Sequence, residues 1–391
     1  MTNKNKVKKF SILLNGKFDY SILIVTLLLL SMGLIMLLSA SAPKSLAEND
    51  NSYEYIMKQG IVAAIGLFFM MILSKIDYRN YRKLKWIIYI GFVVLLIIVG
   101  FVGIGENGAK RWINILGFSF QPSEFAKIGF IIFYAAILSD MKEKNKIKKF
   151  VPGFVYPLMF LLPVAYAVFI LQNHFSATFI IAAITCVQMF VAGSMLRYFL
   201  GVGLVGVGGL ALYILKGIAS GETDSFRLGR IETWLNIEAD LTGAGWQINQ
   251  SLYAIGSGGL FGLGLGNSRQ KYLYLPEPQN DFIFAVLAEE LGFVGSIFVI
   301  ILFALFVWRG IIIAIKAEDN FGTLIAIGIT TMIGLQALIN IAVVTNTIPV
   351  TGMPLPFFSY GGSAMLADLM AVGILLSVSR NSKKNNKSDR I

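Results

Sequence analysis

Long runs of apolar residues alternate along this chain with short polar segments. A run of about 18 or more apolar residues is long enough to cross a bilayer as a helix, so runs of this length predict membrane spans. The segments expected to span are 20–43, 59–74, 86–105, 121–139, two within 150–196, 198–219, 282–308 and two within 321–379. The polar turn 172–174 and the Pro- and Gly-rich segment 348–362 divide the two double-length runs. The pattern predicts an all-α polytopic membrane protein of about ten transmembrane helices, forming one domain over residues 1–391.

The composition agrees with this pattern and excludes several other classes. Of the 391 residues, 56% are hydrophobic and 14% are charged, whereas soluble domains have about 45–50% and about 25%. The single cysteine, Cys186, and the single histidine, His174, exclude an intramolecular disulfide, a cysteine metal cluster and multi-histidine metal sites. The net charge is +11, but the lysines lie in short loops beside the spans, so nucleic acid is not an expected partner.

The uneven distribution of positive charge predicts the orientation in the membrane. Cytoplasmic loops are enriched in Lys and Arg. With both termini in the cytoplasm, most of the 33 lysines and arginines fall on the inner side. We therefore expect cytoplasmic tails of about residues 1–18 and 380–391. A large extracellular loop of about residues 220–281 is expected between the seventh and eighth helices.

Ionisable residues at the outer ends of the predicted spans are the first candidate functional residues. A charge inside a span costs about 2.5–3.5 kcal/mol on insertion scales, so it marks a functional site by default. The set is Lys110, Arg111, Glu124, Lys127, Glu277, Asp281, Glu289 and Glu290. Glu124 and Lys127 are three residues apart on a helix expected to begin near Pro122, so they share a face.

Each of these groups also has a structural interpretation. Glu124 and Lys127 are then an intramembrane ion pair, and Asp281 is the N-cap of the following helix. Glu289 and Glu290 are then hydrogen-bonded inside the bundle. In the functional interpretation, cations at the outer end of the helix bundle bind a phosphate or pyrophosphate, and a neighbouring carboxylate takes a proton from a hydroxyl group. The residues thus favour a lipid-phosphate substrate at the outer leaflet, which is either transported or chemically changed.

Three long stretches carry a family resemblance. They are GAKRWINILGFSFQPSEFAK (108–127), GWQINQSLYAIGSGGLFGLGLGNSRQKYLYLPEPQNDFIFAVLAEELGFVG (245–295) and PVTGMPLPFFSYGGSAML (349–366). In these stretches the chain resembles the SEDS family of FtsW, RodA and SpoVE, with details closer to the FtsW and SpoVE branch. It departs from many relatives at Asn173, where they have a proline, so no catalytic role is assigned to that turn.

The resemblance implies a peptidoglycan glycosyltransferase of the bacterial cytoplasmic membrane. Such an enzyme polymerises lipid II into β-1,4 glycan strands on the outer face, for division or sporulation. The implied partners are a class B penicillin-binding protein and other membrane proteins of the divisome or elongasome. Asp281 matches the family's essential aspartate, and Glu124 and Lys127 match its functional pair.

The chemistry implied is an inverting transfer, because an α-phosphate donor becomes a β-linkage. Asp281 is the expected general base, and Lys127 with Arg111 or Lys110 is expected to stabilise the departing pyrophosphate. Substrate contacts are expected from Lys110, Arg111, Gln121, Glu277, Ser359 and Tyr360. A divalent cation, Mg²⁺ or Mn²⁺, is the only cofactor expected, with Glu124, Glu277 and Asp281 as candidate ligands.

Two other functions remain open at this point. One is a flippase that moves lipid II across the bilayer, for which Asp368 in the last span is the best-suited residue. Against it, the charged groups gather at the outer mouth rather than at the midplane where transporters bind their substrates. The other is a non-catalytic scaffold of the division machinery.

Overall fold

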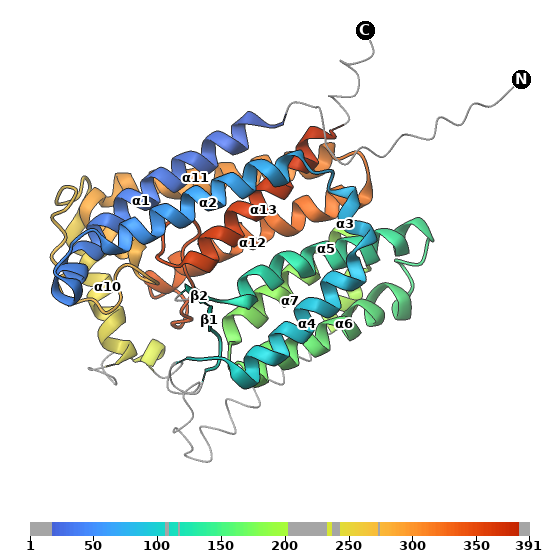
Figure 1. Cartoon of the computed structure of the whole chain (residues 1–391), viewed down its shortest axis with the longest axis horizontal. Coiled ribbons are helices and arrows are strands. Elements are labelled where there is room, and N and C mark those ends of the chain that lie inside the picture. The colour runs from blue at the N-terminus through green and yellow to red at the C-terminus, as the bar shows by residue number, and fades with distance from the viewer. Residues whose placement is uncertain are drawn as a thin grey trace, which may run out of the picture.

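The computed structural model describes residues 18–105, 109–115, 118–201, 233–236, 243–272 and 274–382, and shows a bundle of long helices (Figure 1). The helices are α1 (Tyr20–Asn49), α2 (Glu54–Lys75), α3 (Arg79–Lys83), α4 (Lys85–Val102), α5 (Pro122–Glu143), α6 (Tyr156–Ala165), α7 (Phe175–Ala192), α10 (Ala244–Gly258), α11 (Ile283–Lys316), α12 (Asn320–Val344) and α13 (Gly362–Arg380). Two π-helical segments, η1 (Val151–Val155) and η2 (Tyr166–Leu171), flank α6. The predicted all-α polytopic fold is confirmed.

Eight helical segments among the described residues are long and apolar enough to cross a membrane. They correspond to predicted spans, including the two within 150–196 that the turn at 172–174 separates. α5 is a ninth long helix, but its charged residues lower its hydropathy. Most of the predicted span 198–219 and much of the predicted loop 220–281 lie outside the described residues, so the count of ten stays a prediction.

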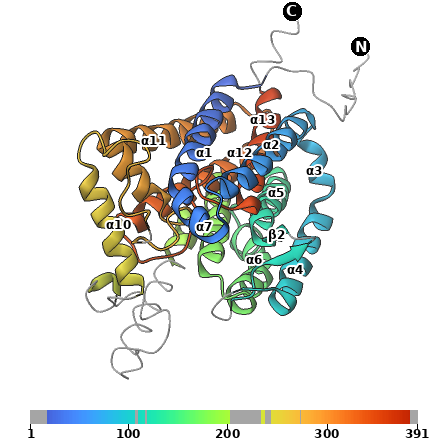
Figure 2. The ribbon, with the colours of Figure 1, turned by 60° about the vertical axis from the view of Figure 1, so that its left-hand side comes forward.

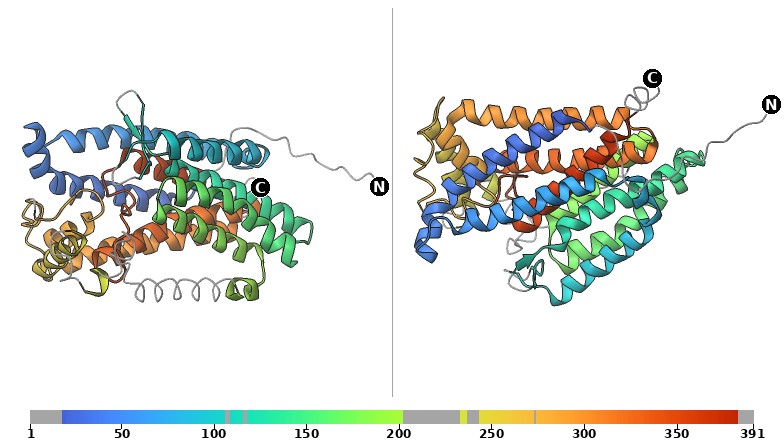
Figure 3. Two further views of the ribbon diagram at one scale, coloured as in Figure 1. Left: turned by 90° about the horizontal axis from the view of Figure 1, so that it is seen from below. Right: turned by 45° about the horizontal axis from the view of Figure 1, so that its top comes forward.

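The core is formed by α5, α12 and α13, which the other helices surround (Figures 2 and 3). α5 is buried almost all round from Pro122 to Leu138. By contrast, α2 and α4 leave many large apolar side chains exposed, as expected of helices that face lipid. A helix buried on all sides must satisfy any charge it carries inside the protein. The charges of Glu124 and Lys127 on α5 therefore need partners inside the bundle.

Both ends of the described chain lie at one end of the bundle. The Asp19 backbone N–H, just before α1, donates to Ser379 Oγ near the end of α13, at 3.0 Å. Arg79 at the start of α3 forms ion pairs with Glu318 and Asp319, between α11 and α12, at the same end of the bundle (Figure 1). This agrees with both termini lying on one side of the membrane, and that this side is the cytoplasm stays a prediction.

A short hairpin is an addition to the predicted all-α fold. β1 (Ile113–Ile115) and β2 (Phe118–Phe120) are antiparallel, with Ile113 opposite Phe120. The alternation of polar and apolar residues in INILGFSF is the pattern of a strand pair rather than of a helix. The hairpin leads directly into α5.

Candidate active site

Two predicted site residues form a buried ion pair in the first turns of α5. Pro122 begins the helix, where its missing N–H leaves no hydrogen bond unmade. Lys127 Nζ lies 2.8 Å from Glu124 Oε2, and the two side chains are 2% and 6% exposed. The Gln336 side chain of α12, with its amide oxygen toward the ammonium, accepts a hydrogen bond from Lys127 at 2.6 Å. The ion pair of the structural interpretation is therefore present.

Asp281 lies at the junction between the segment 274–282 and α11. Phe282, and not Asp281, occupies the N-cap position of α11, so the interpretation of Asp281 as its N-cap is wrong. The half-buried Asp281 side chain faces Gly352: a Cβ on that glycine would lie 3.4 Å from Asp281 Oδ2. Gly352 has φ +67°, a conformation that residues other than glycine rarely adopt. The loop therefore brings backbone without a side chain next to the carboxylate.

The loop 348–361 packs against the residues that precede Asp281. The Tyr360 N–H donates to the Gln279 carbonyl oxygen at 2.8 Å. Ser359 Oγ donates to the Asn280 carbonyl oxygen at 2.6 Å and accepts from the Leu355 N–H at 2.8 Å. The Ser359 hydroxyl, predicted to contact substrate, is thus buried and joins two loops.

Glu277 is tied into the same region. It has φ +49° and forms an ion pair with Lys44 of α1. Its Oε2 accepts hydrogen bonds from the side chains of Asn280 at 2.8 Å and Gln279 at 3.0 Å. The Glu277 side chain is nonetheless 50% exposed. Glu277 thus stabilises the local structure and remains accessible to a substrate.

The predicted cations at 110 and 111 lie beside the polar turn 172–174. Lys110 is exposed, and its Nζ donates to the Phe101 carbonyl oxygen at 3.0 Å. Arg111 donates to the carbonyl oxygens of Gln172 at 3.4 Å and Asn173 at 2.5 Å. Arg111, a predicted site residue, therefore holds the turn 172–174, to which the sequence analysis assigned no catalytic role.

His174 is the residue of this turn that sequence reasoning missed. It is 6% exposed, and its Nδ1 has no hydrogen-bond partner among the described residues. Burial, together with the charges of Arg111 and Lys127, lowers the pKa of His174 to about 3. Its imidazole is therefore neutral, and it lies within electrostatic reach of both predicted cations.

One hydrogen bond connects this turn to the Asp281 region. Ser176 Oγ, in the first turn of α7, donates to the Thr351 carbonyl oxygen at 2.5 Å. Thr351 directly precedes Gly352, which faces Asp281. The structure thus links the predicted base, through the loop 351–353, to the turn that Arg111 binds.

The beginning of α13 closes the site from another side. The Gln121 backbone N–H donates to Ser363 Oγ at 2.9 Å, which joins the start of α5 to the start of α13. Asp368, further along α13, is buried and interacts electrostatically with Lys127 and Glu124. Its Oδ1 has no hydrogen-bond partner in the part of the chain that the structure describes. The Glu124–Lys127 pair is therefore part of a larger buried polar cluster.

Glu289 and Glu290 belong to a different network. Both are fully buried on α11, just before Gly292, which has φ +67° and interrupts the helix. Glu289 accepts hydrogen bonds from Ser268 Oγ at 2.5 Å and from neighbouring backbone N–H groups. Glu290 forms an ion pair with Lys271 at 2.8 Å. They hold the loop that follows α10 against α11, as their structural interpretation expects.

The predicted carboxylate ligands do not form a metal-binding group. No three His, Cys, Asp or Glu side chains gather to hold a metal ion within the described ranges. Glu124 and Glu277 are each paired with a lysine. In this arrangement these residues do not fit the expected cation site.

Comparisons with known proteins agree over nearly the whole chain. Residues 20–384 match a family described as "Cell cycle protein" that comprises FtsW, RodA and SpoVE. The chain is 45% identical over 368 residues to stage V sporulation protein E of Bacillus subtilis, covering 93% of this chain and 98% of that protein. It is 40% identical over 364 residues to a probable peptidoglycan glycosyltransferase FtsW of Geobacter sp. (strain M18), covering 93% and 96%.

Solved structures show the same architecture. The fold is similar, with a TM-score of 0.74 and 26% identity, to a chain from a study of how a peptidoglycan synthase complex coordinates polymerization and crosslinking. That match covers 93% of this chain and 98% of the other. The rod shape determining protein RodA of Thermus thermophilus gives a TM-score of 0.68 at 26% identity, covering 94% and 98%.

Proposed function

Because this chain belongs to the cell cycle protein family of FtsW, RodA and SpoVE and is a peptidoglycan glycosyltransferase, we propose that Asp281 is the general base of its reaction. The substrate proposed is lipid II, polymerised into β-1,4 glycan strands at the outer face of the membrane. Support comes from relatives of the FtsW and SpoVE branch at 40–45% identity over more than 90% of each chain. The chain is an integral membrane protein, which suits a substrate held in the bilayer by its lipid.

One geometric observation supports Asp281 in this role. Its carboxylate is only half-buried, and the nearest residue of the facing loop is a glycine without a side chain. A general base must come within about 2.6–3.2 Å of the oxygen whose proton it takes. In the proposed reaction the acceptor sugar's 4-hydroxyl gives its proton to Asp281 while its oxygen attacks the anomeric carbon of the donor. The bond from that carbon to the phosphate oxygen breaks, and the configuration inverts.

The departing pyrophosphate needs cations, and three lie on the side of the site formed by the hairpin and α5. Lys110 is exposed and Arg111 is partly exposed, so both side chains are accessible to phosphate oxygens, which supports them as direct contacts. Lys127 is buried and paired with Glu124. Its positive charge therefore stabilises the pyrophosphate from a distance, or contacts it only after the ion pair with Glu124 has opened. Of the other proposed contacts, Gln121, Glu277 and Tyr360 are partly or largely exposed, whereas Ser359 shapes the loop.

A class B penicillin-binding protein is the partner we propose. The support is that one structurally similar chain comes from a synthase complex in which polymerization and crosslinking are coordinated. Proteins of the divisome or elongasome are further proposed partners. The 45% identity to a sporulation protein favours a role in sporulation or division.

Purified protein incubated with lipid II tests the proposal against its two alternatives. In detergent, new glycan polymer made from lipid II supports the glycosyltransferase, with or without added penicillin-binding protein. In vesicles, labelled lipid II that changes leaflet without forming polymer supports a flippase instead. If neither polymer nor translocation appears even with the partner, a scaffold is the better interpretation.

A further inference from the structure

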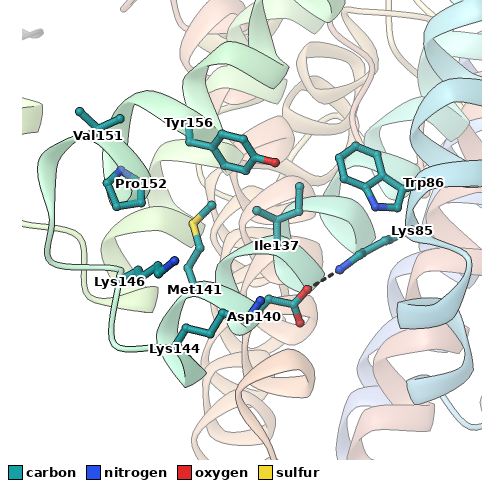
Figure 4. Close-up of a pocket in the computed structure, with 10 residues that line it drawn as sticks. All are labelled: Lys85, Trp86, Ile137, Asp140, Met141, Lys144, Lys146, Val151, Pro152 and Tyr156. Carbon is teal, nitrogen blue, oxygen red and sulfur yellow. Dashed lines mark hydrogen bonds and ion pairs between the residues drawn. The ribbon is translucent and has the colours of Figure 1, made fainter.

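A cavity of about 390 Å³ lies beside the C-terminal end of α5 (Figure 4). The candidate active site is at the other end of this helix, where Glu124 and Lys127 lie. α4 contributes Lys85 and Trp86, and α5 contributes Asp140 and Met141. η1 and α6 close the cavity with Val151, Pro152 and Tyr156, and the turn after α5 adds Lys144 and Lys146. This volume lies within the range of about 300–1,000 Å³ typical of ligand pockets.

The lining combines cations with apolar and aromatic side chains. Trp86 and Tyr156 are exposed by 44% and 39%, and Val151 by 63%. Trp and Tyr in such positions mark the boundary between hydrocarbon and headgroups. The cavity therefore offers an apolar side for acyl chains and a charged side for a headgroup.

The charge of the cavity is positive once its one carboxylate is accounted for. Asp140 forms ion pairs with both Lys85 and Arg82 (Figure 4 shows the first). Lys144 and Lys146 form no side-chain hydrogen bond or ion pair with the residues that the structure describes. Two ammonium groups thus remain available to a negatively charged ligand.

The backbone holds these two lysines in place. Asn145 has φ +53° and its N–H donates to the Lys142 carbonyl oxygen at 3.1 Å, while the Lys146 N–H donates to the Met141 carbonyl oxygen at 2.9 Å. These are the two hydrogen bonds of a Schellman motif, which ends α5 in a fixed conformation. The lysines therefore lose little backbone freedom when they bind a ligand.

We propose that this cavity binds one anionic phospholipid, with its phosphate on Lys144 and Lys146 and its acyl chains along Trp86, Val151 and Tyr156. Basic pockets between transmembrane helices on the cytoplasmic side suit anionic headgroups. This end of the bundle carries Asp19 and Ser379 and is the one predicted to face the cytoplasm. Lysines after a helix also favour its C-terminus, but that effect requires neither a cavity nor aromatic side chains. The inference is independent of the proposed reaction.

Lipid retention by the purified full-length protein tests the proposal. The protein is first placed in nanodiscs that contain equal amounts of phosphatidylglycerol and phosphatidylcholine, and is then extracted into detergent. Native mass spectrometry counts the molecules of each lipid that stay bound to the protein. We expect phosphatidylglycerol to be retained preferentially, and the variant Lys144→Gln/Lys146→Gln to lose about 5-fold in that preference for each lysine removed. The matched control is Lys148→Gln/Lys149→Gln, which removes the same charge from exposed residues that do not line the cavity.

Equal losses in the two double variants would show unspecific attraction of lipid to a basic surface and would overturn the proposal. The absence of any preference for phosphatidylglycerol would overturn it too, and would leave an acidic peptide as the occupant to test. A second measurement uses lipids with brominated acyl chains, which quench nearby tryptophans. The quenching of Trp86 is the difference in fluorescence quenching between the wild type and Trp86→Phe. We expect this quenching to be stronger with brominated phosphatidylglycerol than with brominated phosphatidylcholine. In Lys144→Gln/Lys146→Gln the two lipids should quench Trp86 equally.

Discussion

The side-chain amide of Asn340 donates a hydrogen bond to the backbone carbonyl oxygen of Asp281 at 2.7 Å. The same amide donates to the carbonyl oxygen of Met353, also at 2.7 Å. One buried residue of α12 therefore fixes both the segment that carries the proposed base and the loop that faces it. Asn340 is a positioning residue in this arrangement, since it acts through the backbone of Asp281.

Replacement of Asn340 by Ala is expected to lower the rate of polymerisation more than it weakens binding. A displacement of about 1 Å at a reacting group costs about 100-fold in rate, so we expect a fall of about 10- to 100-fold in kcat with KM little changed. Lipid II polymerisation by purified protein measures both. Thr345→Ala, near the end of the same helix, is the matched control. A folded Asn340→Ala enzyme with wild-type kcat would contradict the positioning role.

Gly352→Ala tests whether the space beside Asp281 matters. The new methyl group would lie 3.4 Å from Asp281 Oδ2, at a position with φ +67°. We expect a stability loss of about 1–2 kcal/mol from the left-handed backbone conformation, together with a reduced rate. At Gly361, an added Cβ meets only the Ala364 Cβ at 3.7 Å, which is an ordinary contact. Gly361→Ala should therefore change neither quantity, and equal effects at both glycines would argue against a specific role for the space.

Asp281→Asn keeps the size of the side chain but replaces one acceptor oxygen with a donating NH2 group, and so removes the base. Loss of a general base costs about 100- to 10,000-fold in rate, so polymer should fall below detection while lipid II still binds. Asp50→Asn removes an equal charge at an exposed position after α1 and should leave the rate unchanged. Full polymerisation by Asp281→Asn would exclude Asp281 as the base.

The Glu124–Lys127 pair needs a double variant, because each single change leaves a buried charge without its partner. Such a loss costs about 3–5 kcal/mol, so Glu124→Gln and Lys127→Gln should each unfold at a lower temperature. In Glu124→Gln/Lys127→Gln both charges are gone, and we expect most of the thermal stability to return. If the lysine also stabilises the leaving group, polymerisation stays low in this stable double variant. If Glu124→Gln/Lys127→Gln recovers both activity and stability, the two residues form only a structural ion pair.

Local relationships could be predicted from the sequence, whereas contacts between distant segments could not. The spans follow from apolar run length, and the proximity of Glu124 to Lys127 follows from helical spacing. The contact of Asn340 with Asp281 joins residues 59 positions apart and depends on how α11 and α12 pack. Hydropathy contains no information about that packing. Pro43 shows a local limit: the first span was expected to end there, yet α1 continues through it to Asn49.

His174 predicts how stability depends on pH. Its pKa is lowered to about 3 in the folded protein, against an ordinary value of 6.5. Between these two values the unfolded chain binds a proton that the folded protein does not, so stability falls as the pH drops below about 6.5. The slope contributed by this one group is at most about 1.4 kcal/mol per pH unit. Thermal unfolding of wild type and His174→Asn at pH 7 and pH 5 measures it: the wild type should lose more stability than the variant. An equal loss in both would mean that the imidazole is protonated in the folded protein, and that burial and the charges of Arg111 and Lys127 do not exclude a further positive charge.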